Sequence, residues 1–307
     1  MKVAYIDDEY ALAEAYLKKT YGLIEKKVIA EEGDLTYKLR DSEKIFGYKI
    51  YKNGPLSKLY EMDFFVVKFA FSNIDTTHSN AQEKVLSSLF YQLSQAVRNQ
   101  KGYYNIRIPA HLVDVIRAYN NNFKNSIFCG GSVNYISSNS KPNNSLTFDK
   151  DIFLINEQEL EENEAQLLDL AYTSFDLYQG QYHISPVTSN KAGQIYSQWL
   201  KNDLEIIKNG QSEMKCLVIK YKETLAGFLT FSENAQFING VLNAISYETR
   251  NIGLFHKLIE AVIIRAHNAK KIYISSTQLD NFAVQKVWNS LGMKPYNSFY
   301  NFHFDSR

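Results

Sequence analysis

Strand-like apolar runs alternate with amphipathic helical runs along most of this 307-residue chain, and this alternation limits the possible folds more than any other feature. Residues 62–72 form an apolar run with β-branched and aromatic side chains, as in a buried strand, and the apolar residues of 79–100 recur at helical spacing. Residues 102–110, 111–123 and 132–137 then repeat the order strand, helix, strand. The first half is therefore predicted to be an α/β unit.

The second half has its own order of elements. Two helices are predicted in residues 156–175 and 189–207, and a hairpin with its turn near Lys222 is predicted in residues 214–234. Strand, helix, strand, helix and strand follow in residues 237–248, 253–269, 270–277, 282–292 and 298–304. The resulting order, ααβββαβαβ, predicts fold class α/β (α+β), with a mixed sheet flanked by helices.

A polar stretch separates the two halves. Residues 135–151 are rich in Ser and Asn, contain a Pro and have few apolar side chains, as linkers do. The length of the chain allows two domains, each large enough to bury a core. We therefore expect one domain in residues 1–143 and a second in residues 144–307.

The composition excludes several classes of protein. Lys and Arg number 34 against 33 Asp and Glu, so the net charge of +1 gives no reason to expect nucleic acid or a membrane as partner. Cys129 and Cys216 are in different predicted domains, and the six histidines show no spacing that would complete a metal site with them. Without a signal-like start or a membrane-spanning run, we expect a cytoplasmic protein without a metal, acting on a small molecule.

The passage from residue 243 to residue 266 is the most informative part of the chain. A strand ends near Ile245, a loop follows, and Gly253 stands where a helix with one apolar face begins. A helix N-terminus presents unpaired N–H groups, Arg250 adds a positive charge, and a glycine lets a phosphate approach the backbone. This pattern predicts a pyrophosphate cradle. An ordinary strand-to-helix turn with one glycine is the alternative, because one Arg-x-x-Gly is a weak signal.

Two motifs resemble those of the GCN5-related N-acetyltransferases (GNAT). Arg250-Asn251-Ile252-Gly253 resembles the Arg/Gln-x-x-Gly-x-Gly/Ala acetyl-CoA motif, and Asn281 with "AVQKVWNSLGM" resembles the family's Asn-x-x-Ala…Tyr…Leu-Gly-Phe segment. The resemblance covers residues 151–307 and implies a catalytic domain that binds acetyl-CoA and transfers acetyl directly to a primary amine.

Shorter similarities extend to two-domain amino-sugar acetyltransferases of the dTDP-fucosamine type. Residues 40–50 and 106–123 resemble that group's N-terminal half, and residues 181–186 and 196–200 resemble its substrate-side segments. The resemblance implies a truncated GNAT-like N-terminal domain and, as acceptor, an amino group on a nucleotide-linked sugar. Two alternatives stay open: acetylation of a peptide, amino-acid or polyamine amine, and a non-catalytic GNAT-fold binding module. The resemblance also suggests a homodimer formed through sheet edges.

The resemblance assigns the cofactor site residue by residue. The strands that end at residues 245 and 275 are expected to splay apart, so that backbone groups near Ile245 and Ser246 pair with the pantetheine arm and Asn281 contributes its amide. Gly292 is expected to end the following helix in a conformation that glycine favours. The implied cofactor-binding residues are Ala244, Ile245, Ser246, Arg250, Asn251, Ile252, Gly253, Leu254, Phe255, Asn281 and Trp288.

Two positions depart from the family's pattern. Trp288 stands where many members have a tyrosine that protonates the leaving thiolate, and an indole N–H is far too weak an acid for that task. Trp288 either donates a hydrogen bond to the sulfur or packs, and packing is favoured. Phe255 stands where the motif prefers Gly or Ala, so it either narrows the cradle or points into the core.

The reaction requires two aligned substrates, a proton acceptor and a polarised carbonyl. The N–H near Ile245 is expected to polarise the carbonyl, while His183 or a water chain takes the proton from the amine. The predicted catalytic residues are His183, Trp288 and Tyr300, and the predicted acceptor pocket comprises Tyr182, His183, Tyr196, Trp199 and Tyr300. The acidic run from Glu157 to Glu164 is expected to be the solvated start of a helix.

Overall fold

The computed structural model describes residues 2–5, 30–31, 37–41, 44–71, 80–137, 151–176, 178, 180–210 and 213–307. The chain divides into two compact units, one formed by Met1–Ser132 with Tyr296–Arg307 and the other by Val133–Pro295. The boundary predicted between residues 143 and 144 lies in residues 138–150, outside the described residues. The C-terminal strand, predicted as part of the second domain, is grouped with the first unit.

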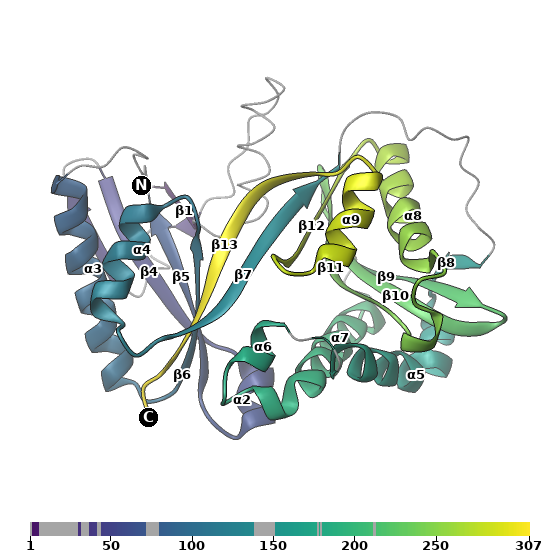
Figure 1. The fold of residues 1–307 in the computed structure, drawn as a ribbon, viewed down its shortest axis with the longest axis horizontal. Coiled ribbons are helices and arrows are strands. Elements are labelled where there is room, and N and C mark those ends of the chain that lie inside the picture. The colour runs from purple at the N-terminus through teal and green to yellow at the C-terminus, as the bar shows by residue number, and fades with distance from the viewer. Residues whose placement is uncertain are drawn as a thin grey trace. The chain divides into compact units, whose positions relative to one another are not determined.

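The first unit contains a mixed sheet covered by two helices (Figure 1). Its strands are β1 (Lys2–Tyr5), β2 (Ala30–Glu31), β3 (Tyr37–Asp41), β4 (Lys44–Lys52), β5 (Phe64–Phe71), β6 (Tyr103–Pro109), the start of β7 (Ile127–Ile136) and most of β13 (Lys294–Asp305). Its helices are α2 (Gly54–Tyr60), α3 (Asn80–Asn99) and α4 (Val113–Asn122). The strands and helices predicted in residues 62–123 are therefore confirmed.

Strand pairing explains why β13 belongs to the first unit. β13 runs antiparallel to β6, from Phe299 opposite Pro109 to Asp305 opposite Tyr103. Its apolar side chains also enter the core beneath α4, where the Phe302 ring lies 4.6 Å from that of Tyr119. This pairing joins segments nearly two hundred residues apart along the chain, so no local pattern in the sequence indicates it.

The second unit contains the predicted order of elements from α5 to α9, with β8 and α6 in addition, while the predicted last strand is mostly in the first unit. It comprises β8 (Ile152–Leu154), α5 (Glu157–Asp176), α6 (Gln181–Ile184), α7 (Ala192–Lys208), β9 (Met214–Tyr221), β10 (Thr224–Glu233), β11 (Phe237–Ile245), α8 (Leu254–Asn268), β12 (Ile272–Gln278) and α9 (Phe282–Ser290). Strands β8, β9, β10 and β11 are neighbours in antiparallel pairs, and β12 is parallel to β11. Helix α8 covers one face of this sheet and α5 and α7 cover the other (Figure 1).

Local sequence accounts for the ends of these elements. The β9–β10 turn places Lys222 and Glu223 at positive φ, as a tight two-residue hairpin requires. At the start of α5, Asn156 Oδ1 accepts from the Glu159 N–H at 2.9 Å and Glu159 Oε2 accepts from the Asn156 N–H at 2.9 Å, which is a capping box. The acidic run is thus the start of a helix, as predicted. The helix predicted from residue 189 begins at Ala192 as α7, because residues Ser189–Lys191 form a separate 3-10 turn before it.

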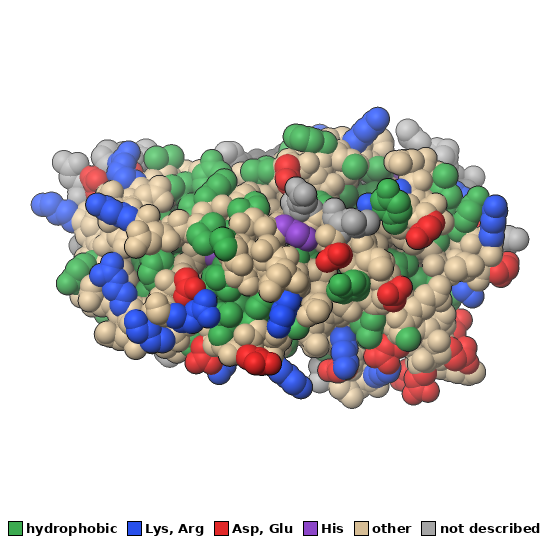
Figure 2. All heavy atoms as spheres, turned by 60° about the horizontal axis from the view of Figure 1, so that its bottom comes forward, with side chains coloured by type: hydrophobic (Ala, Val, Ile, Leu, Met, Phe, Trp, Pro, Cys, Tyr) green, Lys and Arg blue, Asp and Glu red, His purple; other side chains and the backbone are tan. Residues whose placement is uncertain are grey.

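The core of the second unit lies beneath α8. Leu254, Leu258, Ile259, Val262 and Ala266 are buried there, as the helical spacing predicts. Among the described residues, no helix is both long and apolar enough to cross a membrane. Basic and acidic side chains are interspersed on the face shown in Figure 2, with acidic ones more frequent at one end.

Candidate functional site

Strands β11 and β12 pair only along their first halves. Their parallel register runs from Phe237 opposite Ile272 to Gly240 opposite Ser275, after which β11 continues to Ile245 without β12 as its partner. The predicted separation of these two strands is therefore confirmed.

A bulge in β11 accompanies the separation. Thr230 of β10 pairs with Leu242, but Phe231 pairs with Gly240, so Val241 is an extra residue on β11. The Thr230 hydroxyl accepts from the Leu242 N–H at 3.2 Å and donates to Asp203 Oδ2 at 2.7 Å. Two buried residues, Thr230 of β10 and Asp203 of α7, thus stabilise the bulge. No pattern in the sequence indicated these contacts.

Beyond the bulge, β11 has one edge that is not paired with β12. The Ser246 N–H donates to Ala226 of β10 at 2.8 Å. Because successive N–H groups of a strand point to opposite edges, the Ile245 N–H faces the edge of β11 that is not paired with β12. The Ser174 hydroxyl of α5 donates to the Ile245 carbonyl at 3.2 Å and so reaches this same edge. The Ile245 N–H therefore points to the unpaired edge, and its pairing with a pantetheine arm stays a prediction.

The prediction for Ser246 needs correction. Its N–H is used by Ala226, and its carbonyl accepts from the Thr249 N–H at 3.1 Å. Both backbone groups of Ser246 are thus bonded within the chain rather than directed at the gap. Ala244 is buried and, by the same alternation, directs its backbone toward β10.

The loop before α8 is exposed and has an unusual backbone. Asn251 and Gly253 have φ values of 65° and 86°, and a Cβ at Gly253 would meet nothing within 4 Å. The N–H groups of the first turn of a helix have no acceptor inside that helix, and they carry a partial positive charge. No side chain caps α8 at Gly253. The loop therefore fits the anion cradle that the sequence predicts, with Ile252 half exposed beside it.

Phe255 does not enter the cradle. Its side chain is partly buried and packs against the core of the second unit. Leu254 is buried in the same core. Of the two readings of Phe255, the structure supports the one in which the ring points into the core.

Arg250 connects the cradle to α5. Its guanidinium donates from Nη2 to the Ser174 carbonyl at 3.2 Å and lies 5.4 Å from the centre of the Tyr247 ring. The side chain is exposed, so its charge lies at the surface next to the first turn of α8.

Asn281 has a structural role that the sequence did not specify. Its Oδ1 accepts from the Val284 N–H at 3.4 Å, which caps α9, and its Nδ2 donates to Thr277 Oγ1 at 3.0 Å. At the other end of α9, Gly292 has φ of 77° and the Met293 N–H donates to the Trp288 carbonyl at 2.9 Å. The predicted glycine-terminated helix end is confirmed. A contact between Asn281 and a cofactor stays a prediction.

Trp288 lies in the core. Its side chain is fully buried, and its ring centre is 5.1 Å from that of Tyr135. The indole N–H is buried and has no acceptor among the described residues. This placement favours the packing role over a direct catalytic one.

Most of the predicted acceptor residues form one aromatic cluster in the second unit. Tyr196 stacks on Phe175 at 4.1 Å between ring centres, Tyr182 meets Tyr196 edge-on at 5.7 Å, and Trp199 lies parallel to Tyr196 at 6.4 Å. Tyr182 and Tyr196 are buried, while Trp199 is partly exposed. Burial raises the pKa of Tyr196 well above its ordinary value. The sequence did not include Phe175 in this cluster, because a phenylalanine near a helix end has no distinguishing local signal.

His183 and Tyr300 have different surroundings. His183 forms a hydrogen bond through Nε2 with the Asp176 carbonyl at 3.1 Å, and its Nδ1 is buried. Tyr300 lies in the first unit, where its ring meets that of Phe128 edge-on at 5.8 Å. The catalytic roles assigned to both residues stay predictions.

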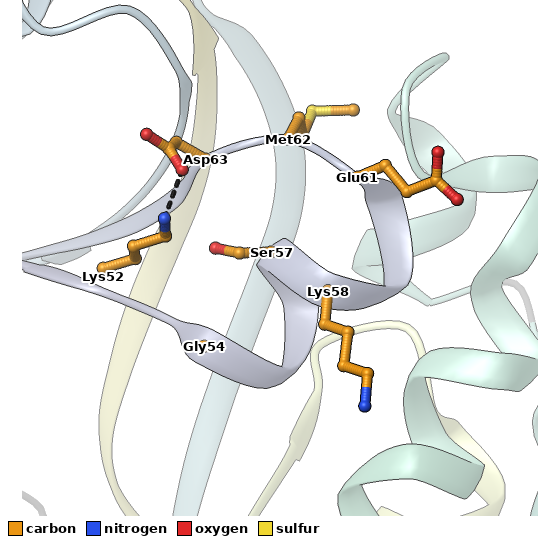
Figure 3. A pocket seen from close by; sticks show the side chains of 7 residues that line it. All are labelled: Lys52, Gly54, Ser57, Lys58, Glu61, Met62 and Asp63. Carbon is orange, nitrogen blue, oxygen red and sulfur yellow. Dashed lines mark ion pairs between the residues drawn. The ribbon is translucent and has the colours of Figure 1, made fainter.

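The structure also contains a shallow hollow on α2 of the first unit, about 380 Å³ in volume (Figure 3). It is lined by Lys52, Gly54, Ser57, Lys58, Glu61, Met62 and Asp63. Lys52 forms an ion pair with Asp63, and none of the lining residues was predicted to be functional. Within the described ranges, no group of three or more His, Cys, Asp or Glu is placed to hold a metal ion.

Comparison with protein-family models and with curated proteins gave no match. Solved structures do match. A GCN5-related N-acetyltransferase from Sphaerobacter thermophilus is similar over 96% of this chain and 86% of its own, at 10% identity and a TM-score of 0.55. A GNAT-family acetyltransferase from Colwellia psychrerythraea is similar over 99% of this chain and 100% of its own, at 13% identity and a TM-score of 0.51.

A third match is a tandem GNAT protein from the clavulanic acid biosynthesis pathway. It covers 99% of this chain and 98% of its own, at 9% identity and a TM-score of 0.50. At such identities the likeness is one of fold. The separated strands, the bulge and the order of elements agree with it, and the protein therefore has the GCN5-related N-acetyltransferase fold in a chain of two units.

Proposed function

We propose that this protein is an acetyl-CoA-dependent N-acetyltransferase that transfers acetyl directly to a primary amine. The observation that carries the proposal is the separation of β11 from β12 after Gly240, beside a helix whose exposed first turn begins at Gly253. One feature leaves an unpaired strand edge for an extended amide-containing chain, and the other leaves N–H groups for phosphates.

The residues present fit acetyl-CoA. The first turn of α8, with Gly253 and the charge of Arg250, would hold the pyrophosphate. The free edge of β11 at Ile245 would pair with the pantetheine arm. When bound, acetyl-CoA supplies an acetyl group already activated as a thioester.

The chain's own groups then have simple tasks. With acetyl-CoA bound, the Ile245 N–H would donate to the acetyl carbonyl oxygen and would stabilise the negative charge that develops there. The attacking amine must lose a proton, either to His183 or to water in its vicinity. The rest of the site orients the two substrates.

For the acceptor, we propose an amino group on a nucleotide-linked sugar. Support comes from the sequence resemblance of residues 181–186 and 196–200 and from the aromatic cluster that these segments build around Tyr196. Trp199 is the partly exposed member of this cluster, and an aromatic face with a polar edge suits a ligand that is apolar on one face and polar at its rim. Peptide, amino-acid and polyamine amines are the competing acceptors.

Calorimetric titration of the purified protein with acetyl-CoA tests the proposal. We expect micromolar binding, about −8 kcal/mol, that is lost in Gly253→Trp because the indole fills the cradle. Gly210→Trp is the matched control, since Gly210 also has positive φ, 65°, and open space around its Cβ position. Equal loss in both variants would point to misfolding, and no binding by the unmodified protein would leave the non-catalytic module as the better account.

Acceptor screening follows if acetyl-CoA binds. Nucleotide-linked amino-sugars are compared with free amino acids, peptides and polyamines as substrates. Turnover restricted to the comparators would reject the amino-sugar while leaving the acetyltransferase intact.

A further inference from the structure

Two side chains of β12 meet β11 at the last position where the two strands pair. Gly240 is opposite Ser275 in the parallel register, and the Ser275 hydroxyl donates to the Gly240 carbonyl at 3.2 Å. Tyr273 is two residues earlier on β12, so its side chain points to the same face of the sheet as that of Ser275. Both side chains are buried. They therefore gather at the point from which β11 continues without β12.

Gly240 leaves the space that these two side chains fill. A Cβ at Gly240 would overlap the Tyr273 hydroxyl, and it would lie 2.9 Å from Ser275 Oγ and 3.0 Å from Tyr273 Cζ. Gly240 does not have a positive φ, so close approach rather than backbone conformation explains the glycine. The Tyr273 hydroxyl thus occupies a hollow above Gly240, and this fit fixes the register of the two strands where their pairing ends.

The Tyr273 hydroxyl fits this hollow without being well bonded. The side chain is fully buried in the core of the second unit. Although Ser275 is beside it, the phenol oxygen forms no hydrogen bond of good geometry within the described residues. A poorly bonded hydroxyl in an apolar core is costly, and a phenylalanine would fill the same space without that cost. The hydroxyl therefore contributes its shape at Gly240 more than a hydrogen bond.

Strand β10 holds β11 directly beyond this point. Val241 is the bulge residue, and the Thr230 hydroxyl accepts from the Leu242 N–H at 3.2 Å. Strand β11 is thus fixed on one side by β12 at Gly240 and on the other by β10 at Leu242. The edge that extends from there to Ile245 starts from a defined position.

We propose that Tyr273 and Ser275 are positioning residues for acetyl-CoA, which fix Gly240 as the point where β11 leaves β12 and so hold the free edge at Ile245 in place for the pantetheine arm. This inference rests on the proposed function. An edge that is already held in its bound position loses little conformational freedom on binding, so the ligand binds more tightly than to an edge that must first be ordered. Both residues act through β11 rather than by touching the cofactor.

Tyr273→Phe is the first test, because it removes the oxygen from the hollow and keeps the ring. We expect calorimetry to show acetyl-CoA binding about tenfold weaker, because the pantetheine arm must then order a loosened strand end. Binding of adenosine bisphosphate, the half of CoA that lacks this arm, should be unchanged, because it meets only the cradle. Equal weakening of both ligands, or unchanged binding of acetyl-CoA, would overturn the role of Tyr273.

Urea unfolding shows whether the core of the variant is intact. Both tryptophans lie in the second unit, so their fluorescence reports on that unit. The midpoint of Tyr273→Phe should be no lower than that of the unmodified protein, because the lost hydroxyl is buried and poorly bonded. A lowered midpoint together with weaker binding would assign Tyr273 to core packing alone and reject the proposal.

Tyr119→Phe is the matched control. Tyr119 is a fully buried tyrosine in the core of the first unit, and its hydroxyl likewise has no hydrogen bond of good geometry among the described residues. This variant should bind acetyl-CoA as the unmodified protein does. A loss of affinity equal to that of Tyr273→Phe would show that the effect is not specific to the hollow at Gly240.

Gly240→Ala tests the hollow itself. The added methyl group overlaps the Tyr273 hydroxyl, so we expect this variant to bind acetyl-CoA at least about tenfold more weakly. In the double variant Gly240→Ala/Tyr273→Phe the methyl group takes the place of the oxygen, and we expect binding within about threefold of the unmodified protein, a non-additive result typical of residues in contact. Additive losses in the double variant would contradict the proposed fit.

Ser275→Ala removes the hydrogen bond to the Gly240 carbonyl. We expect it to weaken acetyl-CoA binding about fivefold, again without an effect on adenosine bisphosphate. Ser197→Ala is its control, because the Ser197 hydroxyl also donates to a carbonyl, that of Leu168, at 3.0 Å. An equal loss in both variants would remove Ser275 from the proposal.

The two proposals fail in different ways. If the unmodified protein does not bind acetyl-CoA, the acetyltransferase proposal fails, and the positioning role of Tyr273 and Ser275 fails with it. If the unmodified protein binds acetyl-CoA and the Tyr273→Phe and Ser275→Ala variants bind it equally well, only the positioning role is rejected.

Discussion

The Ser174 hydroxyl donates to the Ile245 carbonyl at 3.2 Å, and the Ser174 carbonyl in turn accepts from Arg250 at 3.2 Å. One residue of α5 is therefore bonded both to the unpaired edge of β11 and to the loop that precedes α8. These are the two features to which the acetyl group and the pyrophosphate are assigned.

Ser174→Ala should impair the site beyond its effect on stability. Loss of this hydrogen bond is expected to cost about 1–2 kcal/mol and to let the end of β11 move, lowering kcat about tenfold in a steady-state assay. Ser197→Ala is a close match, because the Ser197 hydroxyl also donates from a helix to a carbonyl, that of Leu168, at 3.0 Å. A similar fall in kcat for both variants would reduce Ser174 to a general packing role.

Arg250→Ala should weaken binding of acetyl-CoA more than it slows the reaction. We expect KM for acetyl-CoA to rise about tenfold with kcat changed little, and the salt dependence of binding to become shallower, because a surface charge near the phosphates is lost. Arg117→Ala, which removes an exposed arginine from α4, should leave both quantities unchanged. The idea fails if the KM of Arg250→Ala keeps the salt dependence of the unmodified protein.

Asp203→Asn should stabilise the second unit at neutral pH. Burial raises the pKa of Asp203 from 3.8 to about 6, although the hydrogen bond from Thr230 opposes the shift. Because the folded-state pKa is raised, the contribution of Asp203 to stability is fully present below pH 3.8. This contribution, about 3 kcal/mol, is lost as the pH rises through about 6. The asparagine keeps an acceptor for Thr230 and removes the titration.

Tryptophan fluorescence during urea unfolding measures this effect. Both tryptophans, Trp199 and Trp288, lie in the second unit, so their signal reports on that unit alone. At pH 7.5 the urea midpoint of Asp203→Asn should exceed that of the unmodified protein, and at pH 4 the two should approach each other. A midpoint for Asp203→Asn below the unmodified one at pH 7.5 would contradict the account.

His303 should give the first unit the opposite dependence on pH. Its ring is buried, its Nδ1 lies 2.8 Å from the Tyr103 hydroxyl, and burial lowers its pKa from 6.5 to about 4. Because the unfolded chain takes up the proton first, stability is present above pH 6.5 and is lost as the pH falls toward 4, by about 3 kcal/mol.

His303→Asn should flatten this dependence. Urea unfolding between pH 7.5 and 4.5, followed by circular dichroism, should show a smaller fall in midpoint for the variant than for the unmodified protein. Fluorescence recorded in parallel separates this transition from that of the second unit. His267→Asn, a substitution on α8, should keep the slope of the unmodified protein, and an equally steep fall in His303→Asn would remove His303 as its source.

The sequence was informative where the signal is local. Helical spacing and apolar runs predicted the elements from α5 to α9 other than the short α6, and Gly292 predicted the end of α9, because periodicity and a left-handed residue depend on neighbours along the chain. The resemblance predicted the separation of β11 from β12, which was then found to begin after Gly240.

The features that escaped prediction depend on contacts between distant residues. Ser174 is an ordinary residue near a helix end, and only the tertiary fold brings it to Ile245. The bulge at Val241 exists only in the register of two strands. Ser246 was assigned to the gap because the alternation of N–H groups cannot be known before that register is known.

The pairing of β13 with β6 also has a consequence for the order in which the protein is made. The second unit is topologically an insertion within the first, since the chain leaves the first unit after Ser132 and returns to it at Tyr296. A ribosome releases residues 133–295 before it releases residues 299–305, which β6 needs as its partner. The unit whose synthesis begins first is therefore the last to be completed, and until then β6 exposes an unpaired edge.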